Sequence, residues 1–546
     1  MRLASTKTKN ETGFDFVIQN ISIRTPYGKK CLKEMTAFFP GEEDKLREEL
    51  NKLSSVFAIL SGHPQKMDVL DEILMEIKEI SFTVSRSINN VLSVVEFYEL
   101  KNFLLQIERL GALIHEFGKN MPETLVLIET KNLLDILDPR GDRINTFYIY
   151  DDFSELLGSL RKEKHNLEIA IRQEKKQIKQ QLEKEFCISM TPKFELLISK
   201  SNPEHLAKAR RIEQLAVECE DYMTITYVIK STEALDATMK RMEEINFQID
   251  EEELKVRTNL SRKVAIHQED LQKNCLIVGE LDFVIAKARY AKVNNCCKPE
   301  IENVHVIEIT DGRHLMVEKI LGDKGKTFCP VSINLADGVT CITGANMGGK
   351  TISLKMVGLV SLLAQHGFFV PCHEAKLGLS SSINILIGDT QSMQRGLSSF
   401  GSEMEELKDI LDQSQKNALI LIDEIASGTN PVEGLALTKS VIGYLSAKSY
   451  ITLVTTHFDN AAMDKSVQNM QVRGLSGADM TKLGQELQHA NRRERIEVIS
   501  RHMDYRLYAV SSGQEIPKDA LNIAKMLGIY DEIIDEAKKI LMEVKG

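Results

Sequence analysis

The segment CITGANMGGKTISLKM, Cys341 to Met356, constrains the fold of this chain more than any other stretch. Its centre, Gly344 to Thr351, has the spacing G-x-x-x-x-G-K-T. The apolar stretch VTCIT precedes it and an amphipathic run follows, which is the strand–loop–helix order of a phosphate-binding loop. The glycines let backbone N–H groups face a phosphate at a helix N-terminus. We therefore expect a nucleotide site in which Lys350 reaches the β- and γ-phosphates and the Thr351 hydroxyl binds Mg²⁺.

A second segment, NALILIDEIASGTNP, carries two adjacent carboxylates after an apolar run. Leu419 to Ile422 predict a buried strand that ends at Asp423 and Glu424. A carboxylate at the carboxyl end of such a strand can bind Mg²⁺, and its neighbour can polarise the attacking water. The pair favours nucleotide hydrolysis over nucleotide binding alone.

A third segment, SYITLVTTHFDN, predicts another strand over Tyr450–Thr456 with His457 at its end. A histidine in that position can sense the γ-phosphate or position a water molecule.

Composition limits the other function classes. The net charge is −10, so any DNA contact must come from local basic patches and not from the field of the whole protein. The nine cysteines have no C-x-x-C spacing, which argues against zinc. The sequence has no apolar run long enough to cross a membrane and no signal-peptide pattern. We expect a cytoplasmic protein without a membrane partner.

The first half of the chain is helical in pattern. Apolar residues recur at helical spacing from about residue 30 to 150, up to a loop at Pro139 and Gly141. A long charged helix follows, with a coiled-coil seam at Leu160, Leu167, Ile171, Ile178 and Leu182. Such a helix could lie solvated on a core or form an arm. The segments KFELLIS and DYMTITYVI predict short strands, after which a second long helix returns.

Together these patterns predict a multidomain fold. An all-α core carries a long helical lever with a tip of short strands, and an α/β P-loop ATPase domain follows. The predicted ranges are 1–155 for the helical core, 156–298 for the lever, its tip and the return helix, and 299–546 for the ATPase domain with C-terminal helices.

Four segments resemble the MutS family. TGANMGGKT is similar to the TGPNMGGKS loop of these ATPases, and DEIASGTNPVEGLAL and TTHF are similar to the motifs that follow it. DGRHLMVE resembles GRHPVVE, with Leu315 in place of the proline. The resemblance covers about residues 30 to 540.

The resemblance implies a magnesium-dependent ATPase of the ABC superfamily that works as a homodimer with composite ATP sites. It also implies that the tip of the lever acts as a clamp. Lys350, Glu424 and His457 would be catalytic, and Thr351 and Asp423 would bind Mg²⁺. The segment GDTQSMQRGLSSFGSEM would place Ser398 on the γ-phosphate of the neighbouring subunit's ATP. The implied nucleotide contacts are Gly344, Asn346, Met347, Gly348, Gly349, Lys350, Thr351, Ile352 and, as an adenine-stacking residue, Phe328.

The motifs look closer to the bacterial branch of the family that is not dedicated to mismatch repair. The chain has no room for the mismatch-recognition domain and stops before the C-terminal Smr nuclease common in that branch, so we expect both to be missing.

The stretch VEFYEL contains a Phe-x-Glu pair, Phe97 and Glu99, which in mismatch readers of this family wedges into the duplex. Here Ser93 and Glu96 form a capping box, S-x-x-E, which starts a helix. Val94, Val95 and Tyr98 then continue the helical spacing. We therefore interpret Phe97 as a helix-face residue and Glu99 as solvent-facing, and expect little preference for mismatched DNA.

Two functions remain open. The first is a MutS-like DNA-binding clamp whose grip is controlled by ATP, in DNA repair or recombination. The second is an ATP-dependent remodeller of a protein partner, such as a reactivating factor for a cobalamin-dependent aminomutase.

Overall fold

The computed structural model describes residues 2–118, 121–344, 349–388, 399–426, 428–458, 467–475, 477–491, 494–510 and 519–545. The chain forms two compact units. The first unit comprises Met1–Glu72, Ile114–Val126 and Ile277–Gly546, and the second comprises Ile73–Leu113 and Leu127–Leu276. The N-terminal residues join the core that surrounds the nucleotide-binding loop.

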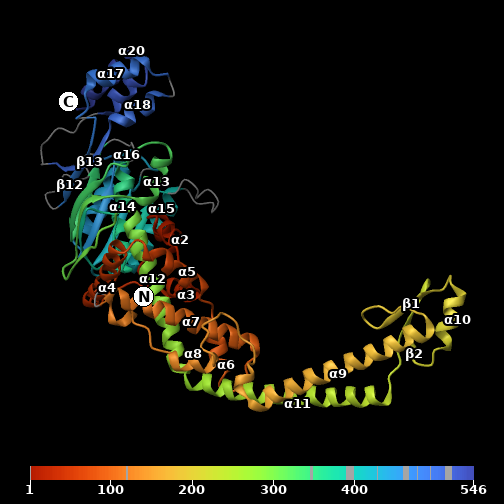
Figure 1. Cartoon of the computed structure of the whole chain (residues 1–546). Coiled ribbons are helices and arrows are strands. Elements are labelled where there is room, and N and C mark those ends of the chain that lie inside the picture. The colour runs from red at the N-terminus through yellow and green to blue at the C-terminus, as the bar shows by residue number, and fades with distance from the viewer. Residues whose placement is uncertain are drawn as a thin grey trace. The chain divides into compact units, whose positions relative to one another are not determined.

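The first unit is built on two sheets (Figure 1). The larger sheet has the strand order β13-β12-β7-β11-β10-β9 within the described residues, and its strands are parallel except for β13. The smaller sheet has the order β4-β8-β5-β6. The strand bounds are β4 Glu300–Glu302, β5 Val306–Gly312, β6 Val331–Ala336, β7 Gly338–Thr343, β8 Glu374–Gly378, β9 Ile383–Ile387, β10 Ala418–Asp423, β11 Tyr450–Thr455, β12 Gln468–Gly474 and β13 Asp504–Ala509.

Helices cover both faces of the larger sheet. Alternate residues of β10 enter different cores: Leu419 and Leu421 pack in the core of α14, and Ile420 and Ile422 pack in the core of α15 and α16. A parallel strand that is buried on both faces needs a continuous apolar run, which explains the sequence ALILI. The helices of this part are α13 Leu315–Asp323, α14 Gly349–Gln365, α15 Ser399–Gln413 and α16 Pro431–Ser446.

The predicted strands of the nucleotide site are confirmed. VTCIT lies in β7, the apolar run before the two carboxylates lies in β10, and the run before His457 lies in β11. The C-terminal helices enclose a separate small core that includes Leu483, Val498 and Ile523. Their bounds are α17 Met480–His489, α18 Glu494–His502, α19 Asp519–Met526 and α20 Asp531–Lys545.

The N-terminal segment is part of the ATPase core, which the sequence pattern did not predict. The backbone N–H of Ile383, at the edge strand β9, donates to the carbonyl of Leu3 at 2.7 Å. A Cβ on Gly358 of α14 would lie 2.6 Å from the Thr12 methyl group, so only glycine allows this approach. Phe14 is buried in the same core. The helices of this region are α1 Thr6–Glu11, α2 Phe14–Gln19, α3 Pro26–Glu34 and α4 Glu43–Gly62.

Three further helices contribute residues to both units: α5 Lys66–Glu76, α7 Val94–Glu116 and α12 Gln268–Val293. The return helix is not continuous, since α11 ends at Ile266 and α12 begins at Gln268. None of the helices within the described residues has both the length and the apolar character needed to span a membrane.

The second unit contains a long antiparallel helix pair. α9 (Glu155–Phe186) and α11 (Glu233–Ile266) run side by side (Figure 1). The predicted seam of α9 is confirmed, because all five of its residues are buried or half-buried. Beyond the pair lies an antiparallel sheet with the order β1-β3-β2 that packs on α10. The remaining bounds are α6 Ser81–Arg86, α8 Lys131–Leu137, β1 Glu195–Ser199, α10 Pro203–Arg211, β2 Leu215–Glu220 and β3 Thr224–Ile229.

The start of α7 confirms the capping box. The Ser93 N–H donates to Glu96 Oε2 at 2.7 Å, and the Glu96 N–H donates to Ser93 Oγ at 3.3 Å. Phe97 is fully buried and its ring lies 5.4 Å from that of Phe147. One detail differs from the prediction: Glu99 is half-buried rather than solvent-facing. Val95 is 65% exposed.

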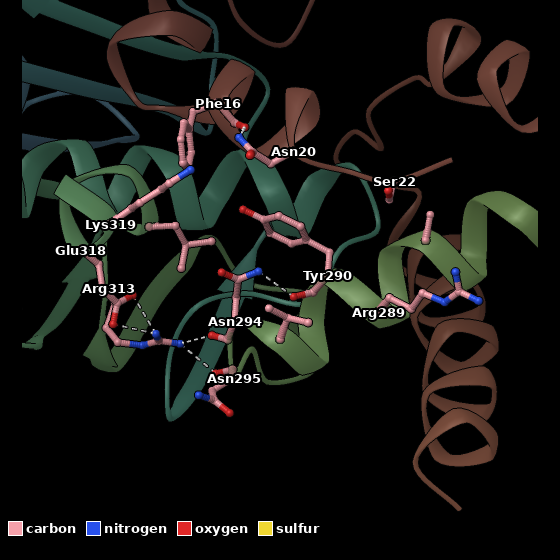
Figure 2. A pocket seen from close by; sticks show the side chains of 13 residues that line it. Phe16, Asn20, Ser22, Arg289, Tyr290, Asn294, Asn295, Arg313, Glu318 and Lys319 are labelled. Carbon is pink, nitrogen blue, oxygen red and sulfur yellow. Dashed lines mark hydrogen bonds and ion pairs between the residues drawn. The ribbon is translucent and has the colours of Figure 1, made fainter. Parts of the chain in front are cut away.

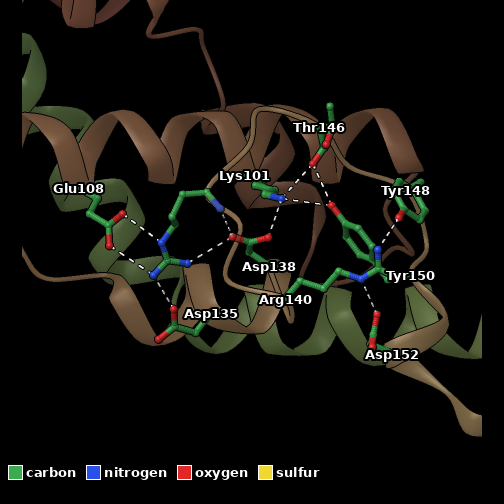
Figure 3. A network of polar contacts seen from close by, with 10 residues as sticks. Lys101, Glu108, Asp135, Asp138, Arg140, Thr146, Tyr148, Tyr150 and Asp152 are labelled. Atoms are coloured by element: carbon green, nitrogen blue, oxygen red, sulfur yellow. Dashed lines mark hydrogen bonds and ion pairs between the residues drawn. The ribbon is translucent and has the colours of Figure 1, made fainter.

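A buried ion pair lies beneath the loop after α8 (Figure 3). Lys101 Nζ lies 2.9 Å from Asp138 Oδ1, and both side chains are almost completely buried. Lys101 also donates to the Thr146 carbonyl and to the Tyr150 hydroxyl. Burial acts to raise the pKa of Asp138, but hydrogen bonds from Lys101 and Arg143 outweigh it and hold that pKa below its usual value. Because each buried charge is fully paired, the loop is fixed on α7.

Candidate nucleotide site

The nucleotide-binding loop lies between β7 and α14. Gly344 has φ +119°, which a residue with a side chain rarely adopts, so this first glycine of the motif is required by the backbone. Gly349 and Lys350 begin α14. The predicted contacts Asn346, Met347 and Gly348 lie outside the described residues.

Lys350 is buried and bridges the two halves of the site. Its Nζ donates to the Gly344 carbonyl at 2.7 Å and lies 3.3 Å from Glu424 Oε1. A buried ammonium group is stable only when it is paired. The buried Lys350 ammonium is therefore held between the nucleotide-binding loop and the carboxylate that follows β10.

The Asp423 carboxylate joins the ends of β10 and β11 to the first turn of α14. Its Oδ2 accepts from Thr351 Oγ1 at 2.8 Å, and its Oδ1 accepts from Thr455 Oγ1. Asp423 and Thr455 are paired residues of β10 and β11, and Thr351 follows β7. The structure therefore brings together the two predicted magnesium ligands. A hydroxyl and a carboxylate are oxygen ligands of the kind that Mg²⁺ prefers, so the donor set fits this ion. Sequence reasoning missed Thr455, although it lies in the quoted TTHF segment.

Glu424 stands on an unusual stretch of backbone. Glu424 and Ala426 have φ of +51° and +58°, in the left-handed region that costs a non-glycine residue about 1 kcal/mol. Hydrogen bonds hold both residues there. The Glu424 N–H donates to the Thr455 carbonyl at 3.0 Å, and the Ala426 N–H donates to Glu403 Oε1 at 2.9 Å. The Glu424 side chain is thereby fixed beside Lys350.

A cavity of about 820 Å³ adjoins the start of α14. The predicted contacts Phe328, Gly349 and Ile352 all line it. Tyr505 of β13 lines it as well, and a Cβ on Gly349 would lie 3.0 Å from its ring. The cavity thus offers two aromatic rings beside the loop. Tyr505 was missed because it lies far from the loop in sequence and has no motif of its own.

The remaining predicted residues are less closely connected. His457 follows β11 and is exposed, and its ring lies 4.1 Å from that of Phe458. Ser398 lies outside the described residues, and α15 begins at the next residue.

A second cavity, of about 580 Å³, lies between α2, the end of α12 and α13 (Figure 2). Arg313 at its edge donates to both oxygens of Glu318, at 3.0 and 2.8 Å, and to the carbonyls of Asn294 and Asn295. Its guanidinium group therefore ties the loop after α12 to α13. The DGRH segment has a structural role here.

Comparison with known proteins agrees with this geometry. Residues 340–545 match the family model for MutS domain V. The match begins within β7 and spans the nucleotide-binding loop, the paired carboxylates and the C-terminal helices.

The chain is also homologous to MutS2 and MutS proteins. It is 33% identical over 288 residues to "Endonuclease MutS2" of Clostridium botulinum, a match that covers 52% of this chain and 33% of the relative. The MutS2 of Acetivibrio thermocellus is 33% identical over 282 residues, covering 50% and 32%. "DNA mismatch repair protein MutS" of Aquifex pyrophilus is 26% identical over 498 residues, covering 88% and 55%. The chain thus spans about a third of the MutS2 relatives and about half of MutS.

We predict that Phe328→Ala and Tyr505→Ala each weaken ADP binding by roughly 5- to 150-fold, because base–aromatic stacking contributes about 1–3 kcal/mol. Titration calorimetry with ADP and with inorganic triphosphate separates the base from the phosphates. Triphosphate affinity should stay unchanged, and the control Tyr444→Ala, on the exposed face of α16, should alter neither ligand. Equal loss for both ligands would show that the rings support the loop and do not contact the base.

Proposed function

We propose that this protein is a Mg²⁺-dependent ATPase that converts ATP and water to ADP and phosphate. The main support is the hydrogen bond from the Thr351 hydroxyl, just after the nucleotide-binding loop, to the carboxylate of Asp423, which is adjacent to Glu424. Glu424 lies within reach of Lys350. MutS domain V, which matches this region, supports the assignment.

Each side chain of the nucleotide site has its own role in this proposal. Lys350 binds the β- and γ-phosphates, and in doing so it gives up its ion pair with Glu424. Glu424 is then free to accept a hydrogen bond from the attacking water and to take up its proton. Thr351 and Asp423 would hold Mg²⁺, which neutralises the charge that develops on the phosphate oxygens. Phe328 and Tyr505 orient the adenine. His457 positions the water or senses the γ-phosphate.

The active form in this proposal is a homodimer. Ser398 of one subunit contacts the γ-phosphate bound by the other, so each ATP site is composite. The protein would act in the cytoplasm. Residues 156–298 would form a lever that ends in a clamp tip. The chain would belong to the branch of the family that does not recognise mismatches.

DNA is the proposed partner of the clamp. The support is homology to a protein named for DNA mismatch repair and to another named an endonuclease. On this proposal ATP binding and hydrolysis control the grip on duplex or branched DNA.

One observation favours a second candidate, an ATP-dependent remodeller of a protein partner. The tip sheet and its connections, residues 187–232, carry six Lys and Arg residues and six Asp and Glu residues. DNA-binding surfaces usually carry an excess of positive charge. A balanced tip is compatible with a protein partner.

The hydrolysis proposal predicts that Lys350→Ala lowers ATP turnover by about 100-fold or more, because the ammonium group stabilises charge on the transferring phosphate. Phosphate release under excess Mg²⁺ measures this. The matched control is Lys355→Ala, one turn along α14, where the side chain pairs with Glu11. The control should keep most of the activity. Undiminished turnover in the Lys350→Ala variant would show that this is not the site of ATP hydrolysis.

The DNA proposal predicts binding that weakens steeply with salt, because neutralised phosphates release counterions. Fluorescence anisotropy on matched duplex, mismatched duplex, junction and single-stranded DNA, with and without ATP, measures this. Matched and mismatched duplexes should bind alike. No binding of any form at low salt would rule out the clamp role and favour the protein partner.

A further inference from the structure

Glu424 and Ala426, which have left-handed backbone conformations, both donate hydrogen bonds to residues outside their own loop. At Glu424 the anchor is Thr455, whose carbonyl and Oγ1 accept the Glu424 N–H at 3.0 and 3.2 Å. Thr455 belongs to the neighbouring strand of the same sheet. At Ala426 the anchor is Glu403, a residue of α15. The loop therefore has one anchor in the sheet and one in a helix.

The hydrogen bond between the Ala426 N–H and Glu403 is buried. Its side chain is only 8% exposed, and Ala426 is 1% exposed. Hydrogen bonds to a charged acceptor are about twice as strong as neutral ones. Burial raises the pKa of Glu403, and the hydrogen bond from the Ala426 N–H opposes that shift.

The carbonyl group of Ala426 packs closely against α16. A Cβ on Gly434 of α16 would lie 2.9 Å from the Ala426 carbonyl oxygen. The Thr438 hydroxyl, one turn along α16, donates to the Gly434 carbonyl at 2.7 Å and lies 3.4 Å from the Ile425 carbonyl. The loop is thus held between α15 and α16, and a shift of α15 would pull directly on the Ala426 N–H.

We infer that Glu403 is a positioning residue: it couples α15 to the backbone that carries Glu424, and so sets the aim of the proposed catalytic carboxylate. The inference rests on the proposed ATPase function. α15 begins directly after Ser398, the residue proposed to contact the partner's nucleotide. Glu403 itself accepts from Ala426, two residues after Glu424, so the helix and the carboxylate are joined through this short stretch of backbone.

The test compares Glu403→Met, which keeps the volume and removes the acceptor, with Glu403→Gln, which keeps an acceptor oxygen. The exposed neighbour Glu405→Gln is the matched control. Glu403→Met should lower kcat about tenfold or more, since small misplacements of a catalytic group cost that much. Its Kd for a fluorescent ATP analogue should change by less than about twofold, because the loss falls on the chemical step. Glu403→Gln and Glu405→Gln should stay close to the original protein.

Two outcomes overturn the inference: Glu403→Met with unchanged kcat, or Glu403→Gln as impaired as Glu403→Met. Hydrogen exchange of the Ala426 amide covers the case in which Glu403→Met does not fold. That amide should be protected in the unmodified protein and in Glu403→Gln, and rapid exchange in the unmodified protein would refute the contact itself. An unmodified protein that hydrolyses no ATP would instead refute the proposed function.

Discussion

The carboxylate of Asp423 is the contact on which the rest of the site depends. It accepts hydrogen bonds from Thr351, after β7, and from Thr455, at the end of β11, while it stands itself at the end of β10. The ends of two neighbouring parallel strands and the first turn of α14 thus meet at one acidic group. A parallel sheet brings the carboxyl ends of its strands to one edge, and that edge is where open α/β sheets bind ligands. The position of Lys350 and Glu424 follows from this arrangement.

The surrounding core keeps these strand ends in register. β10 is buried on both faces, by α14 on one side and by α15 and α16 on the other. The N-terminal segment adds to this packing: Lys7 pairs with Glu406 of α15 at 2.7 Å, and Glu11 pairs with Lys355 of α14 at 2.8 Å. The first residues of the chain therefore contact both the helix of the nucleotide-binding loop and the helix that anchors Ala426. The N-terminal segment therefore belongs to the same compact unit as the nucleotide-binding loop.

The sequence predicted the elements whose signals are local. The loop glycines, the apolar runs of β7, β10 and β11, the seam of α9 and the capping box at Ser93 all lie within short windows, and all are present. The missed features depend on distant partners. Nothing in TKTKNE reveals that α1 packs on the ATPase core, because its contacts come from α14, α15 and β9. Tyr505 and Glu403 have no motif, and only the fold brings them to the site.

The segment VEFYEL shows the same limit. Its capping box predicts the start of a helix, but the ring that packs against Phe97 belongs to Phe147, which lies far away in the sequence. Periodicity separates helices from strands, but it does not report which helices share a core.

In the proposed ATPase, Glu424 acts on water while Lys350 and its neighbours bind the nucleotide. The most direct test is the fate of ATP bound to Glu424→Gln protein in Mg²⁺. We expect this variant to bind ATP as tightly as the unmodified protein and to retain it intact, with hydrolysis slower by about 100-fold or more. Recovery of ADP at the unmodified rate would show that Glu424 does not act on the water.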